Sequence, residues 1–587
     1  MTARPPKLLS KTFRSVFWLA LRIDPAAAIR GLGWVIRGKR VRGWNRLCVV
    51  AAKNPLCFST WARVAEHRQI ENFCAGEVGV DPRYQCVIID ENLVNSEDVR
   101  ATVESVSRAF GDDVVIWSGT QIAGTRPYDQ EAGLARLIAM LSETAATEWL
   151  LPIRAGDVLS PSTGEILRHA QAHQPDAEIL YWDEDVRRGS GRALPWIKPD
   201  WDTLLFLARD VLMGACIVRL AAAAVSKDAQ SDASLPGAGI AATLSAIVET
   251  PGASTPVHIP FILTHRSPPL PDPNLTSGLD EIAMHGAGRV RATQGDRWAW
   301  RNVVPADPAD WPAVSIIIPT RDRHTLLEMC IDSVRRITYA GAVEILIVDN
   351  DSTDAATHAL FKRYRESGLA RVVSAPGDFN FSRLNNLAAK EANGSMLCLL
   401  NNDIEALDGE WLSAMVRHAV REEVGAVGAQ LLYPDGSVQH AGVVIGIGGA
   451  AGHFGKGARP DDDHYGSWIG VTRCVSAVTA ACLVVRRDLY MAVGGFDEDN
   501  FAVAFNDVDF CLRLDQHGYR NVYVAQARLV HHESQSRGLD DTPQKSARFL
   551  QELGALRQRW NTDTYRDARF SPLFSRTSEA CVLEFQA

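Results

Sequence analysis

Two stretches in the second half of the chain decide the fold: V-S-I-I-I-P-T-R-D-R, from Val314 to Arg323, and I-L-I-V-D-N-D-S-T-D, from Ile345 to Asp354. Each begins as a continuous apolar run of the length of a buried strand, and each ends in polar residues. Between them, apolar residues recur at helical spacing from Leu326 to Ile337. The pattern predicts strand, helix and strand, which is typical of an α/β fold with a parallel sheet.

The same alternation continues beyond these stretches. Ala370–Ser374 and Met396–Leu400 read as two more strands, and the second ends at Asn401-Asn402-Asp403. In an open α/β sheet, ligands bind at the carboxyl ends of the strands. Asp403 is therefore a candidate ligand for a hard divalent cation, Mg²⁺ or Mn²⁺. The alternative is that Asp403 caps the next helix, which we expect to begin near Gly409-Glu-Trp411.

Two acids and a histidine complete the candidate residues. Asp507 and Asp509 lie directly before a helical pattern that starts near Cys511. Acids are favoured at a helix N-terminus by the helix dipole, which is the structural explanation for both. The functional explanation makes Asp507 a general base. His531 and His532 follow a strand-like stretch. A lone histidine is more often structural, but a histidine at a strand end could reach a metal ion and a diphosphate.

Length and charge limit the possible classes of protein. The chain has 587 residues, which predicts two to four domains. Its formal net charge of −9 argues against nucleic acid as the main partner. The eleven cysteines are irregularly spaced, which is typical of reduced thiols in the cytosol. No secretory signal and no apolar run long enough to span a bilayer is evident.

The N-terminus differs from the rest of the chain, with twelve Lys or Arg residues and one acid between Met1 and Lys53. From Phe13 to Val50, arginines alternate with tryptophans and aliphatic residues. Such basic amphipathic segments suit the headgroup region of an anionic membrane, so residues 1–53 are a candidate for peripheral contact with the inner membrane. The alternative is a helical extension that packs on its own domain.

Two further regions precede the second half. From about Tyr84 to Arg266, the apolar runs Cys86–Asp90 and Val114–Trp117 flank a helical stretch and predict another parallel sheet. From about Ser267 to Pro312, the chain is rich in Pro, Asp, Gly and Ala, which predicts an extended, loosely packed linker.

The order and number of motifs in the second half carry a resemblance. Besides the two opening stretches, they are F-N-F-S-R-L-N-N-L-A-A (379–389), L-L-N-N-D-I-E (399–405), D-G-S-V-Q-H-A-G-V-V (435–444), S-A-V-T-A-A-C-L-V-V-R-R (476–487), G-G-F-D-E (494–498), A-F-N-D-V-D-F-C-L-R-L (504–514) and H-H-E-S-Q-S-R-G (531–538). Over residues 314–538, the chain closely resembles glycosyltransferase family 2, whose members have the GT-A fold.

The resemblance implies roles for particular residues. The nucleotide-sugar donor would be bound by Pro319, Thr320, Arg323, Asp349, Asn350, Asn386, Asn402, Asp403 and Arg537. Asp403 and His531 would hold the divalent cation, with Asn401 in place of the first acid of the family's D-x-D motif. Asp507 would be the base, with Asn506 in place of a Glu. The implied reaction is a direct, inverting displacement without a covalent sugar on the enzyme.

The first half resembles the same family in a degenerate form, through W-L-L-P-I-R-A-G-D-V-L (149–159), P-D-A-E-I-L-Y-W-D-E-D (175–185), I-K-P-D-W-D (197–202) and H-I-P-F-I-L-T-H-R (258–266). At the D-x-D position only Asp157 remains, and Pro236–Ser245, where the base should fall, contains no acid. We expect a non-catalytic module, although Asp157, Asp183, Glu184 and Asp185 leave an active site possible.

The sequence thus predicts an α/β chain with two GT-A domains in tandem and a basic helical N-terminal segment. The predicted division is 1–72 for that segment, 73–266 for the degenerate domain, 267–312 for the linker, 313–540 for the catalytic domain and 541–587 for a C-terminal helical extension. The expected protein is a cytoplasmic enzyme at the inner face of the membrane that elongates a bacterial surface glycan or lipid-linked acceptor. The alternatives are an inactive glycan- or nucleotide-binding protein and a sugar nucleotidyltransferase; against the last, the chain has no glycine-rich, lysine-bearing phosphate loop.

Overall fold

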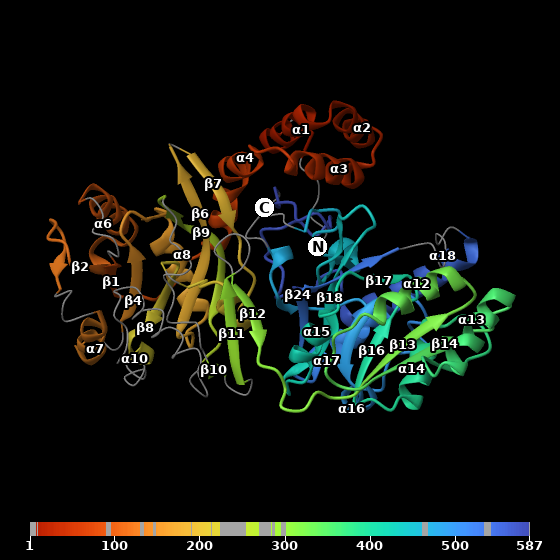
Figure 1. Cartoon of the computed structure of the whole chain (residues 1–587). Coiled ribbons are helices and arrows are strands. Elements are labelled where there is room, and N and C mark those ends of the chain that lie inside the picture. Colours follow the sequence, from red (N-terminus) through yellow and green to blue (C-terminus); the bar gives the residue numbers. More distant parts are fainter. Residues whose placement is uncertain are drawn as a thin grey trace.

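The structure is a computed structural model that describes residues 7–8, 10–89, 96–128, 134–144, 148–189, 191–212, 214–223, 254–268, 283–284, 288–294, 301–460, 468–532 and 542–585. The described helices and strands form an N-terminal helical region and two α/β halves, which lie side by side in Figure 1. Among the described helices, none is both long and apolar enough to cross a membrane.

The basic N-terminal segment is helical, as predicted. It forms α1 (Lys11–Ile23), α2 (Pro25–Ile36) and α3 (Arg40–Ala52), followed by the short helices α4 (Cys57–Trp61) and α5 (His67–Phe73). Ser10 and Asp24 cap the first two helices with their side-chain oxygens. Phe13, Leu19 and Leu47 are among the residues that bury one face of this helical group.

The first half contains a nine-stranded sheet in the order β3-β2-β1-β4-β8-β6-β9-β5, with β7 paired to β6. Its elements are β1 (Tyr84–Ile89), α6 (Ser96–Phe110), β2 (Val114–Ser118), β3 (Arg126–Pro127), α7 (Leu134–Thr144), β4 (Trp149–Arg154), β5 (Val158–Leu159), α8 (Thr163–His173), β6 (Ile179–Arg188), β7 (Gly191–Trp196), α9 (Thr203–Ala208), β8 (Cys216–Arg219), α10 (Leu220–Ala223) and β9 (Val257–Arg266).

The second half contains a ten-stranded sheet in the order β15-β14-β13-β16-β23-β18-β24-β17, with β19 paired to β18 and β22 to β24. Its elements are β13 (Val314–Thr320), α12 (His324–Val334), β14 (Val343–Asp349), α13 (Ala355–Glu366), β15 (Arg371–Ser374), α14 (Phe381–Glu391), β16 (Met396–Leu400), β17 (Ile404–Ala406), α15 (Trp411–Ala419), β18 (Val424–Leu432), β19 (Val438–His440), β20 (Val443–Ile445), β21 (Ala451–His453), β22 (Arg473–Val475), β23 (Cys482–Arg486), α16 (Arg487–Ala492), α17 (Asn506–Gln516) and β24 (Arg520–His531).

The two sheets have the same strand order and the same directions. In both, the first two strands are parallel to each other and to the fourth. In both, the fourth strand is antiparallel to its other neighbour, β8 or β23. The predicted parallel sheets are therefore mixed sheets, because the later strands of each half return in the opposite direction. The correspondence makes position-by-position comparison of the halves possible.

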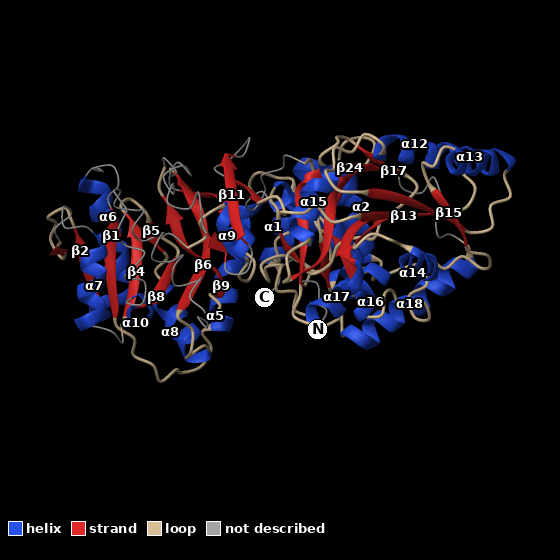
Figure 2. Ribbon diagram, turned by 60° about the horizontal axis from the view of Figure 1, so that its bottom comes forward, coloured by secondary structure: helices blue, strands red, loops and turns tan. Residues whose placement is uncertain are grey.

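Helices cover both faces of the second sheet. Figure 2 shows α12 and α13 on one side, and α14, α16 and α17 on the other. The strands β13 and β16 are buried along their whole length, which explains their uninterrupted apolar sequence. This sheet holds the candidate residues at the ends of its strands.

The predicted linker is more structured than its composition suggests. It contains β10 (Ala283–Met284), β11 (Gly288–Gln294) and β12 (Arg301–Pro305), which form a three-stranded antiparallel sheet. Val303 is buried, and Asn302 accepts a hydrogen bond from Gln526 of the second half. Tertiary packing here overrides a composition that favours loose chain.

The C-terminal extension is helical only over α18 (Pro543–Trp560). Beyond it, the chain crosses between the halves: Arg566 forms two hydrogen bonds with Asp200, and Arg569 donates to the carbonyl of Trp201. Near the end, the carbonyl of Glu584 accepts a hydrogen bond from Trp61. The tail thus connects the N-terminal helices and both halves.

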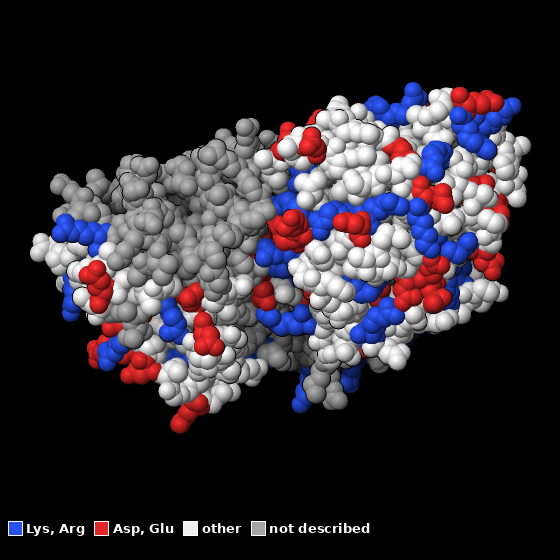
Figure 3. Space-filling model, turned by 90° about the horizontal axis from the view of Figure 1, so that it is seen from below, with Lys and Arg blue, Asp and Glu red and all other residues white. Residues whose placement is uncertain are grey.

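The surface of the second half carries charges of both signs. Figure 3 shows Lys and Arg interspersed with Asp and Glu over the face that it presents. All eleven cysteines are free, as predicted.

Candidate active site

The carboxyl ends of β13 and β16 open onto a cavity of about 620 Å³. The parallel register of these strands brings their ends to one edge of the sheet. The lining residues are Pro319, Thr320, Arg321, Asp322, Arg323, His324, Thr325, Asp354, Phe379, Phe381, Asn401 and Asn402. Of the predicted donor-binding residues, Pro319, Thr320, Arg323 and Asn402 therefore face one cavity.

Hydrogen bonds between loops make the rim of this cavity. Asp322 Oδ1 accepts from the backbone of Thr353 and Asp354, at 2.7 and 2.8 Å. Asn402 Nδ2 donates to Thr320 Oγ1 at 2.8 Å. Asp322 and Arg323 have φ of 57° and 59°, a left-handed conformation that non-glycine residues adopt at a cost of about 1–3 kcal/mol. The surrounding bonds hold this strained turn in place.

Three other predicted donor contacts are engaged within the protein. Asp349 Oδ1 accepts from the backbone of Ser352, at 2.9 Å. Asn350 is fully buried, and its amide donates to the carbonyls of Ala375 and Gly377. Asn386 is also buried, and its amide is bonded to Phe496, Tyr490 and Glu498. Asn350 and Asn386 therefore shape the loops around the cavity and are not among the residues that line it.

The pairing of β17 with β24 brings Asp403 next to His531. Ile404, which follows Asp403, is opposite His531 in the antiparallel register. The Asp403 carbonyl accepts from the backbone of His532 at 2.9 Å. As a result, His531 Nε2 and Asp403 Oδ1 are 3.1 Å apart. Asp403 does not cap the next helix: α15 begins at Trp411, and Asp408 bonds the backbone of Glu410.

This pair fits a divalent cation. Two ligand atoms at right angles on an octahedral ion, each about 2.1 Å from it, are about 3 Å apart. The observed separation of 3.1 Å matches that value. Carboxylate and imidazole are both ligands for Mn²⁺, and Mg²⁺ accepts the carboxylate. Asp403 and His531 are thus the residues that could hold the cation.

Asp507 and Asp509 are two residues apart in the first turn of α17, but their surroundings differ. Asp507 is partly exposed, and its Oδ2 accepts from the backbone of Ala480 at 3.0 Å. Asp509 is fully buried, and its carboxylate is bonded to Arg513, Arg559 and Trp560. Asp507 can therefore reach a substrate, whereas Asp509 is a structural residue.

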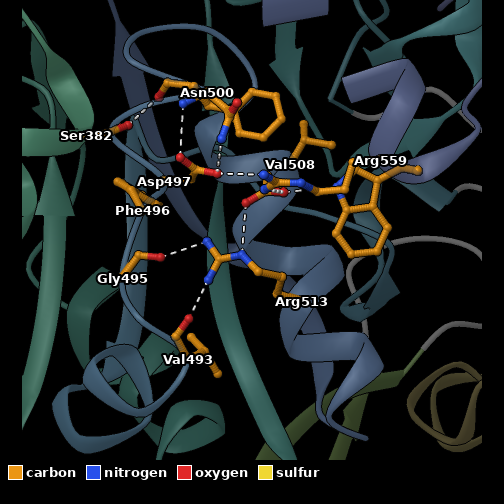
Figure 4. Close-up of polar contacts among 12 residues, drawn as sticks. Ser382, Val493, Gly495, Phe496, Asp497, Asn500, Val508, Arg513 and Arg559 are labelled. Atoms are coloured by element: carbon orange, nitrogen blue, oxygen red, sulfur yellow. Dashed lines mark hydrogen bonds and ion pairs between the residues drawn. The ribbon is translucent and has the colours of Figure 1, made fainter. Parts of the chain in front are cut away.

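A network of polar contacts surrounds Asp509, and Figure 4 shows Arg513 and Arg559, which belong to it. Arg513 donates to Asp509 and to the carbonyls of Val493 and Gly495. Arg559, from α18, bonds both Asp509 and Asp497. The network fixes α17 against the loop before it and against the C-terminal helix. It thereby sets the position of Asp507.

The base candidate and the loop that carries the metal candidate both contact the segment that leads into β23. The backbone of Ala480 donates to Asp507, and the carbonyl of Ala481 accepts from Asn401, two residues before Asp403. Asp507 and the Asn401–Asp403 loop therefore both bond the Ala480–Ala481 segment, and Asp403 of that loop lies beside His531. Arg537, the remaining predicted diphosphate contact, lies outside the described residues.

Residues 315–474 match the protein-family model described as Glycosyl transferase family 2. The chain contains a glycosyltransferase family 2 domain. The match begins in β13 and ends in β22, so it covers the residues that line the cavity and Asp403. Asp507 and His531 of this family 2 domain follow the matched segment.

Three curated proteins are similar to this chain. The uncharacterized protein y4gI of Sinorhizobium fredii is 35% identical over 450 residues, 73% of this chain and 49% of that protein. The O-antigen biosynthesis protein RfbC of Myxococcus xanthus is 36% identical over 406 residues, 66% of this chain and 31% of that protein. An N-acetylglucosaminyl-diphospho-decaprenol L-rhamnosyltransferase of Mycobacterium tuberculosis is 29% identical over 215 residues, 34% of this chain and 69% of that protein.

The matches thus cover about half or less of the length of the first two of these relatives. Among solved structures, the mannosyltransferase PcManGT of Pyrobaculum calidifontis, in complex with GDP-Man and Mn²⁺, is 19% identical. That match covers 46% of this chain and 70% of the other, with a TM-score of 0.32.

The first half carries a different arrangement at the position that corresponds to the metal candidate of the family 2 domain. Val158 pairs with His265 as Ile404 pairs with His531, so Asp157 corresponds to Asp403. Asp157 bonds Arg266 at 2.8 Å. An arginine of the chain itself neutralises this carboxylate, and His265, which corresponds to His531, is bonded to Asp185 instead.

The other acids of the first half are also paired internally. Glu184 bonds Arg266 and the fully buried Lys198. Asp183 bonds His258 at 2.8 Å, and Asp185 bonds His265 at 2.7 Å. These acids are therefore part of a buried charge network. The stretch where the base would fall, residues 236–245, lies outside the described residues.

Sequence reasoning missed several residues of the family 2 domain's cavity. Asp322 and His324 line it beside the predicted Arg323, and Phe379 lines it with a partly exposed ring. The signal for Phe379 was available in the sequence, since an aromatic residue in a polar loop after a strand suits base stacking. No local pattern marks Asp322, whose role is to bond the neighbouring loop.

Proposed function

We propose that the second half is an inverting glycosyltransferase that moves a sugar from a nucleotide-diphosphate donor to a glycan or lipid-linked acceptor. The observation that carries the proposal is the 3.1 Å approach of Asp403 to His531, directly after Asn401 and Asn402 of the cavity lining. Asp507 bonds Ala480, next to the residue that accepts from Asn401. The family 2 match and the names of the relatives, O-antigen biosynthesis and rhamnosyl transfer, support a role in bacterial surface polysaccharide assembly.

In the proposed sugar transfer, the residues of the site have three separate roles. The cavity holds the nucleoside, with Thr320 and Arg323 at its polar side and Phe379 at its aromatic side. Asp403 and His531 would hold a Mg²⁺ or Mn²⁺ ion, which would supply Lewis-acid stabilisation of the diphosphate charge. Asp507 takes the proton of the acceptor hydroxyl.

The bond changes balance in one step. The acceptor oxygen forms a bond to the anomeric carbon as the bond from that carbon to the diphosphate oxygen breaks. The proton goes to Asp507, and the nucleoside diphosphate leaves with the electron pair. Because the oxygen attacks from the side opposite to the leaving group, the configuration inverts.

One experiment tests the proposal directly. The full-length chain is screened against a panel of nucleotide sugars by thermal shift with Mn²⁺, and each hit is tested for transfer to lipid-linked acceptors. We expect one donor to raise the melting temperature and to be turned over. A donor that binds but is not turned over with any acceptor would favour the alternative, an inactive binding protein.

We also propose that the first half is a non-catalytic GT-A-like module in tandem with the catalytic one. Its support is the shared strand order together with the Asp157–Arg266 bond at the metal position. Because its buried acids are paired within the protein, we propose that this half serves as a scaffold. The tail and the linker sheet pack on it. If the first half were catalytically active, Asp157 and Glu184 would have to release Arg266 and Lys198 in order to bind a metal ion.

We further propose that the N-terminal helices lie on the anionic inner face of the cytoplasmic membrane. Their outward side exposes Ile29 by 60%, Ile36 by 68% and Val41 by 51%. The exposed basic residues of the same helices are Lys11, Arg14, Arg22, Arg30, Arg37, Lys39, Arg40, Arg42 and Arg46. Apolar side chains next to cations suit an interface with anionic headgroups.

Vesicle sedimentation of the full chain tests this surface. We expect binding to phosphatidylglycerol vesicles and little to phosphatidylcholine, and a loss of binding in Ile29→Ser/Ile36→Ser and in Arg37→Glu/Arg40→Glu. Leu550→Ser, which removes an equally exposed leucine on α18, is the matched control. Equal sedimentation of all variants would overturn the membrane proposal, as would a chain that only self-associates through these residues.

A further inference from the structure

Gln439 lies next to the metal candidate and belongs to no role assigned so far. It is the middle residue of β19, and its side chain is 4% exposed. Its Oε1 is 2.6 Å from Nδ1 of His531. An amide oxygen only accepts hydrogen bonds, so Nδ1 carries a hydrogen and donates it.

The other ring nitrogen of His531 faces the opposite way. Nε2 is 3.1 Å from Oδ1 of Asp403 and 3.4 Å from the amide nitrogen of Asn401. In the tautomer that carries its hydrogen on Nδ1, the lone pair of Nε2 is directed at the place where Asp403 presents its carboxylate. This is the orientation that a metal-binding histidine needs.

The backbone explains how Gln439 comes to face His531. In the pairing of β18 with β19, Leu432 is opposite Val438 and Leu431 is opposite His440. Gln439 is therefore the extra residue of a β-bulge. Bulges redirect a side chain out of the regular alternation of a strand, and they are frequent beside active sites.

We infer that Gln439 is a positioning residue that fixes the tautomer and the ring orientation of His531 for cation binding. The inference rests on the proposed function, since it takes Asp403 and His531 as the cation ligands. Partners in this position typically change metal affinity by about 10–100-fold when they are removed. Gln439 does not itself touch the cation or the substrate.

Mn²⁺ binding by the full-length chain tests the inference without any donor or turnover. Free Mn²⁺ is counted by electron paramagnetic resonance during a titration, and nitrogen coordination is detected by electron spin echo modulation. The variants are Gln439→Leu, which removes the acceptor, and Gln439→Glu, which keeps an acceptor oxygen. His531→Ala and Asp403→Ala are the ligand controls, and the thermal unfolding midpoint checks folding.

We expect Gln439→Leu to weaken Mn²⁺ binding by about 10–100-fold and to lose the nitrogen modulation. Gln439→Glu should keep both within about threefold. If Gln439→Leu does not fold, Gln439→Met, of nearly the same length, replaces it. Wild-type binding by the Leu or Met variant, with weakened binding in His531→Ala, would overturn the role of Gln439 alone. Wild-type binding by His531→Ala and Asp403→Ala would overturn the cation site and, with it, the inference.

Discussion

At the scale of single residues, the two acids in the first turn of α17 show how surroundings assign roles. Asp507 has one backbone partner, Ala480, besides its own helix and is partly exposed. Asp509 has three side-chain partners and no exposure. A partly exposed carboxylate with spare acceptor capacity can take a proton. A carboxylate bonded on every side cannot exchange its partners for a substrate.

Asp507→Asn is expected to lower kcat by about 10²–10⁴-fold, because general-base catalysis is lost. The affinity for the nucleotide-sugar donor should stay within about twofold, since the amide preserves the shape of the side chain. Steady-state kinetics and donor titration measure the two effects. Asp515→Asn, an exposed acid on the same helix, is the control. Transfer at a near wild-type rate would exclude Asp507 as the base.

Asp403→Ala is expected to weaken Mn²⁺-dependent donor binding by at least about tenfold. Loss of a metal ligand should lower the affinity for the metal at least as much as loss of a residue that hydrogen-bonds a ligand. Isothermal titration with and without Mn²⁺ measures the difference. Glu405→Gln, two residues further on and bonded to His532, should bind the donor as the wild type does. Unchanged affinity in Asp403→Ala under both conditions would refute its metal role.

At the scale of elements, α18 acts as a brace for the loop and helix that carry Asp507. Arg559 and Trp560 bond Asp509 in α17. Glu552 accepts hydrogen bonds from the backbone of Val503 and Ala504, just before α17. Phe505, at the N-cap of α17, has a φ of 62° and packs its ring on Phe549. The C-terminal helix is thus part of the site's support.

Asp509→Asn should lower the thermal unfolding midpoint by about 5 °C. Hydrogen bonds to charged groups contribute about 1.5–3 kcal/mol, and a domain of this size loses about 2–4 °C per kcal/mol. Differential scanning fluorimetry measures the midpoint, and Asp515→Asn again serves as the control. A midpoint within 1 °C of the wild type, on the order of the scatter expected for a neutral surface change, would show that the network contributes little.

Strand β6 gives the first half a dependence on pH. Burial alone would raise the pKa of Glu184, but Arg266 and Lys198 outweigh it and lower that pKa from 4.5 to about 2. A lowered folded-state pKa gives stability above the unfolded value, which is lost as the pH falls from about 4.5 toward 2. The difference in midpoint between wild type and Glu184→Gln should therefore shrink between pH 5 and pH 3. A difference that stays constant would contradict this pairing.

At the scale of the whole molecule, the C-terminal tail joins parts that are distant in sequence. Asp202 of the first half accepts from the backbone of Cys474 in the second. Arg566 and Arg569 of the tail bond the same Asp200–Trp201 segment. One hydrophobic cluster extends from the N-terminal helices through both halves to the tail, and a second cluster lies within the first half. We expect the halves to unfold together.

Removal of residues 561–587 is expected to divide the single calorimetric transition into two, because the bonds to Asp200 and Trp201 are lost. Differential scanning calorimetry of the full and shortened chains measures this. The first transition should fall by several degrees, on the order of 5 °C for about 2 kcal/mol of lost interactions. If the shortened chain still unfolds in one cooperative transition, contacts other than those of residues 561–587 couple the two halves.

Most of the fold was predictable from the sequence, because it depends on patterns that neighbouring residues carry. The runs at Val314–Ile318 and Met396–Leu400 are apolar because both faces of their sheet are covered, and the structure confirms them as β13 and β16. The basic N-terminal segment was predicted as helical for the same kind of reason. The strands of the Pro-rich linker were missed, since their stability comes from packing against distant elements.

The sequence by itself determined the residue types of the site and the order in which they appear, because strand ends and helix starts are local features. Only the tertiary structure decided which of them meet. The pairing of β17 with β24 places Asp403 beside His531, and distant partners bury Asp509, Asn350 and Asn386. The same is true of Asp157, which is neutralised by Arg266 from 109 residues further along the chain. These outcomes depend on long-range contacts, which no local pattern of residues encodes.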